Sequence, residues 1–243
     1  KHHYLFSILA LSGVFFACSS SQPALQTPTT DSVVEAQKTG STITLSSEEK
    51  RDLEALYKAR KDSARMRFTE ADVNFMIGMI GHHAQALIMS DLAPKNGASL
   101  SVQTLASRII NAQNDEIATM QTWLRDREQQ VPMVHVDGLM LMIHGVGDHH
   151  KHHMSHGNMP GMLSQEQLVE LSEAQGVEFD RKFLTYMIEH HAGAVYMVEE
   201  LFKTDGGGEG VETFKIASDI QVDQRTEIAR MRLMLEQIAD ASN

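Results

Sequence analysis

Two stretches of this chain carry the same arrangement of adjacent histidines flanked by methionines. FMIGMIGHHAQALIMSDL begins at Phe75, and FLTYMIEHHAGAVYMVEE begins at Phe183. On an α-helix that turns about 100° per residue, the four repeated side chains of each copy fall on one stripe roughly 120° wide. They are Met79, His82, His83 and Met89 in the first copy, and Met187, His190, His191 and Met197 in the second. The pattern predicts a repeated chemical site on repeated helices.

The segments downstream of each copy also repeat. Gln113, Glu116 and Met120 are spaced i, i+3, i+7, which places them on one helical face. The second set is Gln224, Glu227 and Met231. Each repeat is therefore predicted to be a helical hairpin, at residues of about 70–128 and 177–239. Because each motif helix has an apolar face wider than one partner can cover, we expect the hairpins to share one four-helix bundle.

Helix-start signals give the remaining organisation. A Ser or Thr followed three residues later by Glu, Asp or Gln is typical of a capping box. Such pairs are Ser46 with Glu49, Thr69 with Asp72, and Ser164 with Gln167. The first pair predicts an extra N-terminal helix. No stretch shows sustained period-two alternation, so the predicted fold class is all-α.

The quoted motifs resemble the DUF305 family of bacterial envelope proteins. FDRKFLTYMIEHHAGAVYM, preceded by MPGMLSQEQL, carries most of the likeness, and DVNFMIGMIGHHAQALIM is similar to the same motif. The proline that commonly precedes the His pair is replaced by Gly81 and Glu189. The resemblance extends from about Ala71 to Ala239 and implies a ferritin-like helical bundle. It also implies copper binding in some members, whereas many members have no assigned activity.

An apolar run at the start of the chain indicates export. Tyr4 to Ala17 is too short to span a bilayer, but it suits the core of a signal peptide, and Cys18 follows directly. We predict a signal peptide at residues 1–17, a flexible tether at 18–45 that begins at lipidated Cys18, and a helical domain at 46–243. Serine at position 19, directly after the cysteine, resembles the signal for delivery to the outer membrane of Gram-negative cells, so we predict that the protein is anchored there and faces the periplasm. The alternative is a cleaved signal with an incidental cysteine.

The net charge of the chain is −11, and it has no basic stripe that could follow a phosphate backbone. This composition argues against nucleic-acid binding. Cys18 is the sole cysteine, so an intramolecular disulfide or a thiolate metal site is ruled out within this sequence. Metal ions and a membrane are the expected partners, and the sequence identifies no protein partner.

The connector between the hairpins, residues 130–163, is rich in histidine and methionine. This composition is typical of metal-binding tracts. A flexible tract binds ions loosely, whereas ligands mounted on helices are already ordered and bind more tightly. We predict that the tract is a secondary metal site. Its candidate ligands are His149, His150, His152, His153, Met154, His156 and Met159.

The candidate ligands of the repeats predict copper. Thioether with imidazole suits Cu(I), for which silver is a surrogate, and imidazole with carboxylate suits Cu(II) or zinc. Glu116, Met120, Glu227 and Met231 join the two His–Met faces as candidate ligands. The predicted role is sequestration or transfer of copper without turnover. One alternative is a structural protein in which the glutamates only satisfy buried histidines; another is a di-iron redox enzyme, which requires more carboxylates.

Overall fold

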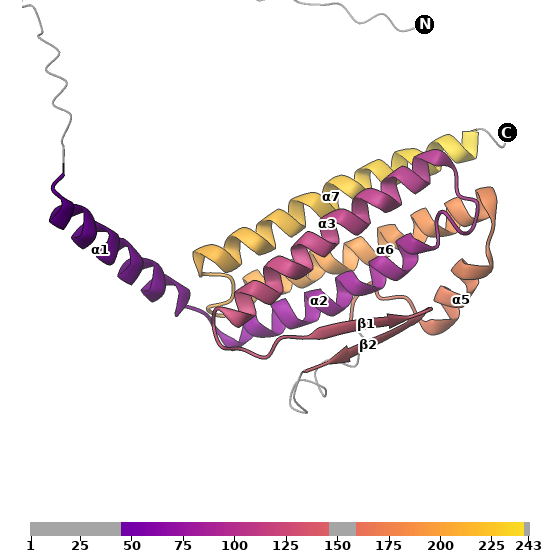
Figure 1. Ribbon diagram of the computed structural model, residues 1–243. Helices are drawn as coiled ribbons and strands as arrows, with labels where there is room; N and C mark the ends of the chain where they lie inside the picture. Colours follow the sequence, from indigo (N-terminus) through magenta and orange to yellow (C-terminus); the bar gives the residue numbers. More distant parts are fainter. Residues whose placement is uncertain (1–44, 146–158, 241–243) are drawn as a thin grey trace, which may run out of the picture. The chain divides into compact units, whose positions relative to one another are not determined.

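A computed structural model describes residues 45–145 and 159–240. Four long helices form its body: α2 (Glu70–Asp91), α3 (Leu100–Arg125), α6 (Gly176–Lys203) and α7 (Val211–Asp240). Helix α2 packs against α3, α6 packs against α7, and the two hairpins meet through α2 with α6 and α3 with α7 (Figure 1). A short helix, α5 (Gln165–Glu173), precedes α6. Capping boxes start α2 at Thr69 and α5 at Ser164, as the sequence predicts.

The core is divided along α2 and α6, which run antiparallel. The first half of α2, from Val73 to Ile80, shares a hydrophobic cluster with the second half of α6, from Ala194 to Leu201. The second half of α2 shares another cluster with the first half of α6. Both histidine pairs lie between these halves and are fully buried. A polar layer therefore crosses the middle of an otherwise apolar core.

Two repeat-equivalent aspartates join the hairpins at opposite ends. The Asp72 carboxylate on α2 accepts a hydrogen bond of 2.7 Å from the backbone of Gly208, which precedes α7. The Asp180 carboxylate on α6 accepts hydrogen bonds of 3.1 and 3.2 Å from the backbone of Ser99, which caps α3. Both aspartates are buried. Each aspartate thus fixes the loop of the other hairpin, which favours one shared body over two separate hairpins.

The connector contains a β-hairpin, so the prediction of an all-α fold was wrong at this point. Strands β1 (Met133–Asp137) and β2 (Met140–His144) pair antiparallel and lie against α2. Gly138, at φ 59°, gives the short turn its positive φ. Methionines and polar residues occupy the outer positions and aliphatic residues the inner ones. Half of the outer positions are methionines, which read as apolar and hid the alternation in the sequence.

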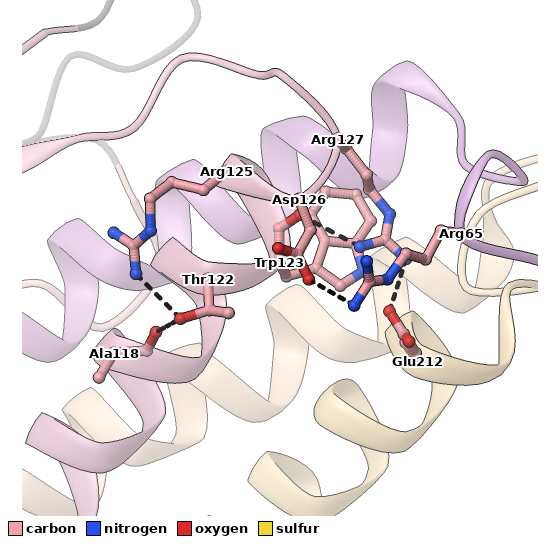
Figure 2. Close-up of polar contacts among 8 residues, drawn as sticks. All are labelled: Arg65, Ala118, Thr122, Trp123, Arg125, Asp126, Arg127 and Glu212. Carbon is pink, nitrogen blue, oxygen red and sulfur yellow. Dashed lines mark hydrogen bonds and ion pairs between the residues drawn. The ribbon is translucent and has the colours of Figure 1, made fainter. Parts of the chain in front are cut away.

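Helix α1 (Ser47–Arg65) is exposed at nearly all of its described side chains. At its end, Arg65 pairs with Asp126 at 3.0 Å. Figure 2 shows the neighbouring network, in which buried Arg127 lies over the Trp123 ring, 4.1 Å from the centroid, and bonds Glu212 of α7 at 2.7 Å. This network joins the end of α3 to the start of α7. Among the helices of the described residues, none is long and apolar enough to cross a bilayer.

Candidate metal centre

The first histidine of each repeat meets its counterpart at the centre of the core. The rings of His82 and His190 are 3.9 Å apart between centroids and tilted by 39°. Burial, with a contribution from neighbouring His83, lowers the pKa of His82 to about 3. Burial, followed by the charge on nearby His82, also lowers the pKa of His190 well below its ordinary value. Both rings are therefore neutral at physiological pH and keep a lone pair.

The second histidine of each repeat bonds the glutamate of its own hairpin. His83 Nε2 lies 2.7 Å from Glu116 Oε2, and His191 Nε2 lies 2.6 Å from Glu227 Oε2. The imidazoles are fully buried, whereas the glutamate side chains retain 17% and 19% exposure. In each contact a glutamate satisfies a buried histidine across its hairpin, as the structural alternative describes, and the structure assigns the contact to the second histidine of each repeat. Each glutamate therefore bonds Nε2, the ring nitrogen that lies farther from the backbone.

The hydrogen bonds of the histidines determine which nitrogens remain free. A carbonyl or a carboxylate can only accept, so Nε2 carries the proton where it bonds Pro160, Glu116 or Glu227. The Nδ1 atoms of His82, His83 and His191 are then bare and have no hydrogen-bond partner in the described part of the chain. His190 lacks a partner at both ring nitrogens there. Buried polar atoms normally have partners, so these nitrogens fit a metal ion that would take their lone pairs.

The predicted methionine ligands surround this polar layer from both sides. Met79 and Met120 lie in one hydrophobic cluster, with partly buried Met197 packed against it. Met89, Met187 and Met231 lie in the other cluster. Within the described residues, no group of three or more His, Cys, Asp or Glu side chains is placed to hold one ion. A metal centre here therefore needs thioethers to complete its ligand set.

The end of the connector covers one side of the histidine layer, which the sequence analysis did not anticipate. The Pro160 carbonyl accepts a hydrogen bond of 3.0 Å from His82 Nε2. Gln85 bonds the backbone of Leu163 at both its N–H (2.8 Å) and its carbonyl (3.0 Å). A Cβ atom on Gly193 would lie 1.9 Å from the Pro160 oxygen, so only glycine permits this approach.

The repeat itself contained a signal for this contact, because the position three residues after the first histidine is Gln85 in one copy and Gly193 in the other. Of the predicted secondary tract, Met159 is described and half-buried, next to Pro160. The other predicted ligands of that tract lie outside the described residues, as do Cys18, the predicted signal peptide and the predicted tether up to residue 44.

An acidic cavity of about 200 Å³ lies between α3 and α7. Three carboxylates line it, with one arginine and two glutamines: Glu116, Asp223, Glu227, Arg108, Gln113 and Gln224. Partial burial, followed by the charges of Glu116 and Glu227, raises the pKa of Asp223. The two glutamines are buried, and the side-chain oxygen of each lacks a hydrogen-bond partner among the described residues. The repeat places both glutamines on the same helical faces as the glutamates, but the predicted ligand set does not include them.

Comparison with solved structures identifies similar proteins. A DUF305 fragment from Deinococcus radiodurans is 27% identical, with a TM-score of 0.54 and coverage of 70% of this chain and 97% of that one. A putative secreted DUF305 protein from Streptomyces coelicolor is 26% identical, with a TM-score of 0.55 and coverage of 70% and 94%. CopM in its Cu(II)-bound form is 30% identical, with a TM-score of 0.51 and coverage of 71% and 99%.

No curated protein matches the sequence. The family model described as "Domain of unknown function (DUF305)" matches residues 72–235. That range includes both histidine pairs, both glutamates and the connector, and it makes up more than half of the chain. The chain belongs to the DUF305 family.

Proposed function

We propose that this protein binds copper at the buried histidine layer and sequesters or transfers the ion without chemical turnover. One observation carries the proposal: three buried histidines present Nδ1 atoms that have no partner among the described residues, while Nε2 is held by an acceptor. Metal-ligating histidines commonly donate their second ring N–H to a carboxylate or a carbonyl. Glu116 and Glu227 then act by fixing the tautomer and orientation of the ligating rings.

The choice of copper follows from the side chains nearest the layer. Imidazole nitrogen and thioether sulfur together suit Cu(I), and silver is its surrogate. Cu(II) and zinc prefer imidazole with carboxylate, whereas no three such side chains among the described residues are placed to hold one ion, which favours Cu(I) at this layer. The likeness to CopM, solved in a Cu(II)-bound form, supports copper. The cavity has three carboxylates against the single positive charge of Arg108, so its net negative charge would attract a cation toward His83 and His191 from the solvent side.

Replacing His83 and His191 by glutamine tests the proposal. Glutamine can keep the hydrogen bond to each glutamate through its amide N–H₂, but it has no equivalent of the Nδ1 lone pair. We expect the double variant to remain folded and to lose Cu(I) affinity in an anaerobic competition titration. The matched comparison is deletion of residues 149–156, which removes tract ligands and leaves the core intact.

The size of the two effects decides the result. Greater loss of tight binding in the glutamine variant than in the deletion supports the core site. Equal Cu(I) affinity of the parent protein and the glutamine variant would contradict the proposal and favour the structural alternative, in which the glutamates only satisfy buried histidines.

We also propose that the protein is lipidated at Cys18 and held in the bacterial envelope, at the outer membrane facing the periplasm. The apolar run before Cys18 supports this location. The contacts among α2, α3, α6 and α7 support the ferritin-like four-helix bundle that the family resemblance implies. Cys18→Ser should release the protein from the membrane fraction, and mass spectrometry of the parent should find acyl chains on Cys18. An unmodified Cys18 would contradict the anchor.

A further inference from the structure

The β-hairpin of the connector carries a ladder of methionine and histidine on one face. Met133 lies opposite His144, and His135 lies opposite Met142. Residues two apart on a strand share a face, and directly opposed residues share it too, so all four side chains lie on one side. Met133 is 62% exposed, and both histidines are exposed.

The other face of the hairpin explains why this one points away from the core. Val134 packs against one hydrophobic cluster and Leu141 against the other. Both strands contact α2 through this aliphatic side. On the opposite face Met133 is exposed and Met142 is half-buried, and neither belongs to the buried core, so core packing does not account for these two methionines.

We propose that Met133, His135, Met142 and His144 form a second, surface binding site for a soft monovalent metal ion. Each of the two pairs on this face, which the Val134–Ile143 pair separates, puts one thioether opposite one imidazole. The two methionines therefore lie on one diagonal and the two histidines on the other. Directly opposed Cβ atoms lie about 4.5–5.5 Å apart in antiparallel sheets, which lets both side chains of a rung reach one ion. Two sulfur and two nitrogen ligands suit Cu(I) or Ag(I) better than hard cations.

This site stands apart from the buried histidine layer and uses none of its residues. The strand backbone fixes the order and spacing of the four ligands, so less ordering is needed on binding than in an irregular segment. The hairpin is also open to solvent, whereas the core histidines are fully buried. The hairpin would therefore exchange metal with the surroundings faster than the core.

An Ag(I) titration of the full-length protein followed by NMR tests the site. Ag(I) is diamagnetic, and ¹³C-methyl-labelled methionines with ¹⁵N-labelled histidines report each ligand separately. We expect the methyl signals of Met133 and Met142 and the ring-nitrogen signals of His135 and His144 to shift together. In the double variant Met133→Leu, Met142→Leu, the shifts of the two histidines should be lost. Met66→Leu is the matched control, because Met66 is 69% exposed and lies outside the hairpin.

The same spectra keep the two proposals distinct, because Met79 and Met187 report the core. Hairpin shifts without core shifts would support the surface site and count against the core site. Unshifted Met133 and Met142 signals at saturating Ag(I) would overturn the surface site. Histidine shifts of the same size in the leucine variant and in the parent would also overturn it, because the thioethers would then not be ligands.

Discussion

Protonation of the central histidine pair should make the metal-free protein sensitive to acid. The folded protein keeps His82 neutral, with a pKa of about 3, and the pKa of His190 is also lowered well below its ordinary value. In the unfolded chain both rings would take up a proton near pH 6.5. Between these limits the unfolded state binds more protons, so the free energy of unfolding falls as the pH falls.

The expected size of the effect follows from the shift of each histidine. Each ring that stays neutral in the folded protein lowers the free energy of unfolding by about 1.4 kcal/mol for every pH unit below about pH 6.5. At about pH 4.5 the contribution of His82 is a loss of about 3 kcal/mol, and the lowered pKa of His190 changes the stability in the same direction. The whole free energy of unfolding of an ordinary domain is about 5–15 kcal/mol. The metal-free protein should therefore lose a substantial part of its stability at that pH.

Urea unfolding followed by circular dichroism, in steps from about pH 7.5 to about pH 4.5, measures this loss. The matched variant is His82→Gln with His190→Gln, which removes both titrating rings and can keep a donor to the Pro160 carbonyl. Carboxylates titrate in both proteins, so the difference between the two curves isolates the histidines. Parallel curves for parent and variant would refute the argument, because the buried pair would then take up no fewer protons folded than unfolded.

Three further outcomes are expected. Gly193→Ala should lower the free energy of unfolding by about 1–3 kcal/mol in urea unfolding, because the new Cβ would overlap the Pro160 carbonyl; an unchanged midpoint would contradict that close approach. Met79→Leu with Met187→Leu should lower the free energy of unfolding by less than about 1.5 kcal/mol per site. The same variant should bind Cu(I) more weakly in competition titrations, with a smaller effect on Cu(II). Unchanged Cu(I) affinity would leave these methionines as packing residues. Asp223→Asn should slow Cu(II) binding in stopped-flow measurements, most strongly at low salt; equal rates at all salt concentrations would argue against the acidic cavity as the route of entry.

The spacing of residues along the sequence predicted the features that depend on residues close together in the chain. Periodicity places a residue on a helical face, so a contact between the glutamate and a histidine of each hairpin could be anticipated from the repeat, but not that the second histidine makes it. The capping boxes at Thr69 and Ser164 are equally local. These features depend on residues within a few turns or within one hairpin.

Features that depend on contacts between distant segments could not be read in this way. No local pattern shows that the Pro160 carbonyl reaches His82, because that contact depends on the path of the whole connector. The β-hairpin escaped prediction because its exposed face is occupied partly by methionine, which reads as apolar in a pattern of alternation. The departure of Gly193 from its repeat partner Gln85 was the one sequence signal of the turn that covers the site.

The contact between the connector and only one of two equivalent histidines makes the halves of the centre chemically different. In a symmetric dimer of identical hairpins, both histidines would have the same neighbours. Here the two hairpins belong to one chain with a single connector, so His82 gains a carbonyl acceptor, whereas His190 has none within the described residues. Because the two hairpins belong to one chain, the two equivalent histidines can act differently as ligands. His82 has a fixed tautomer, whereas either ring nitrogen of His190 can offer its lone pair to a metal ion.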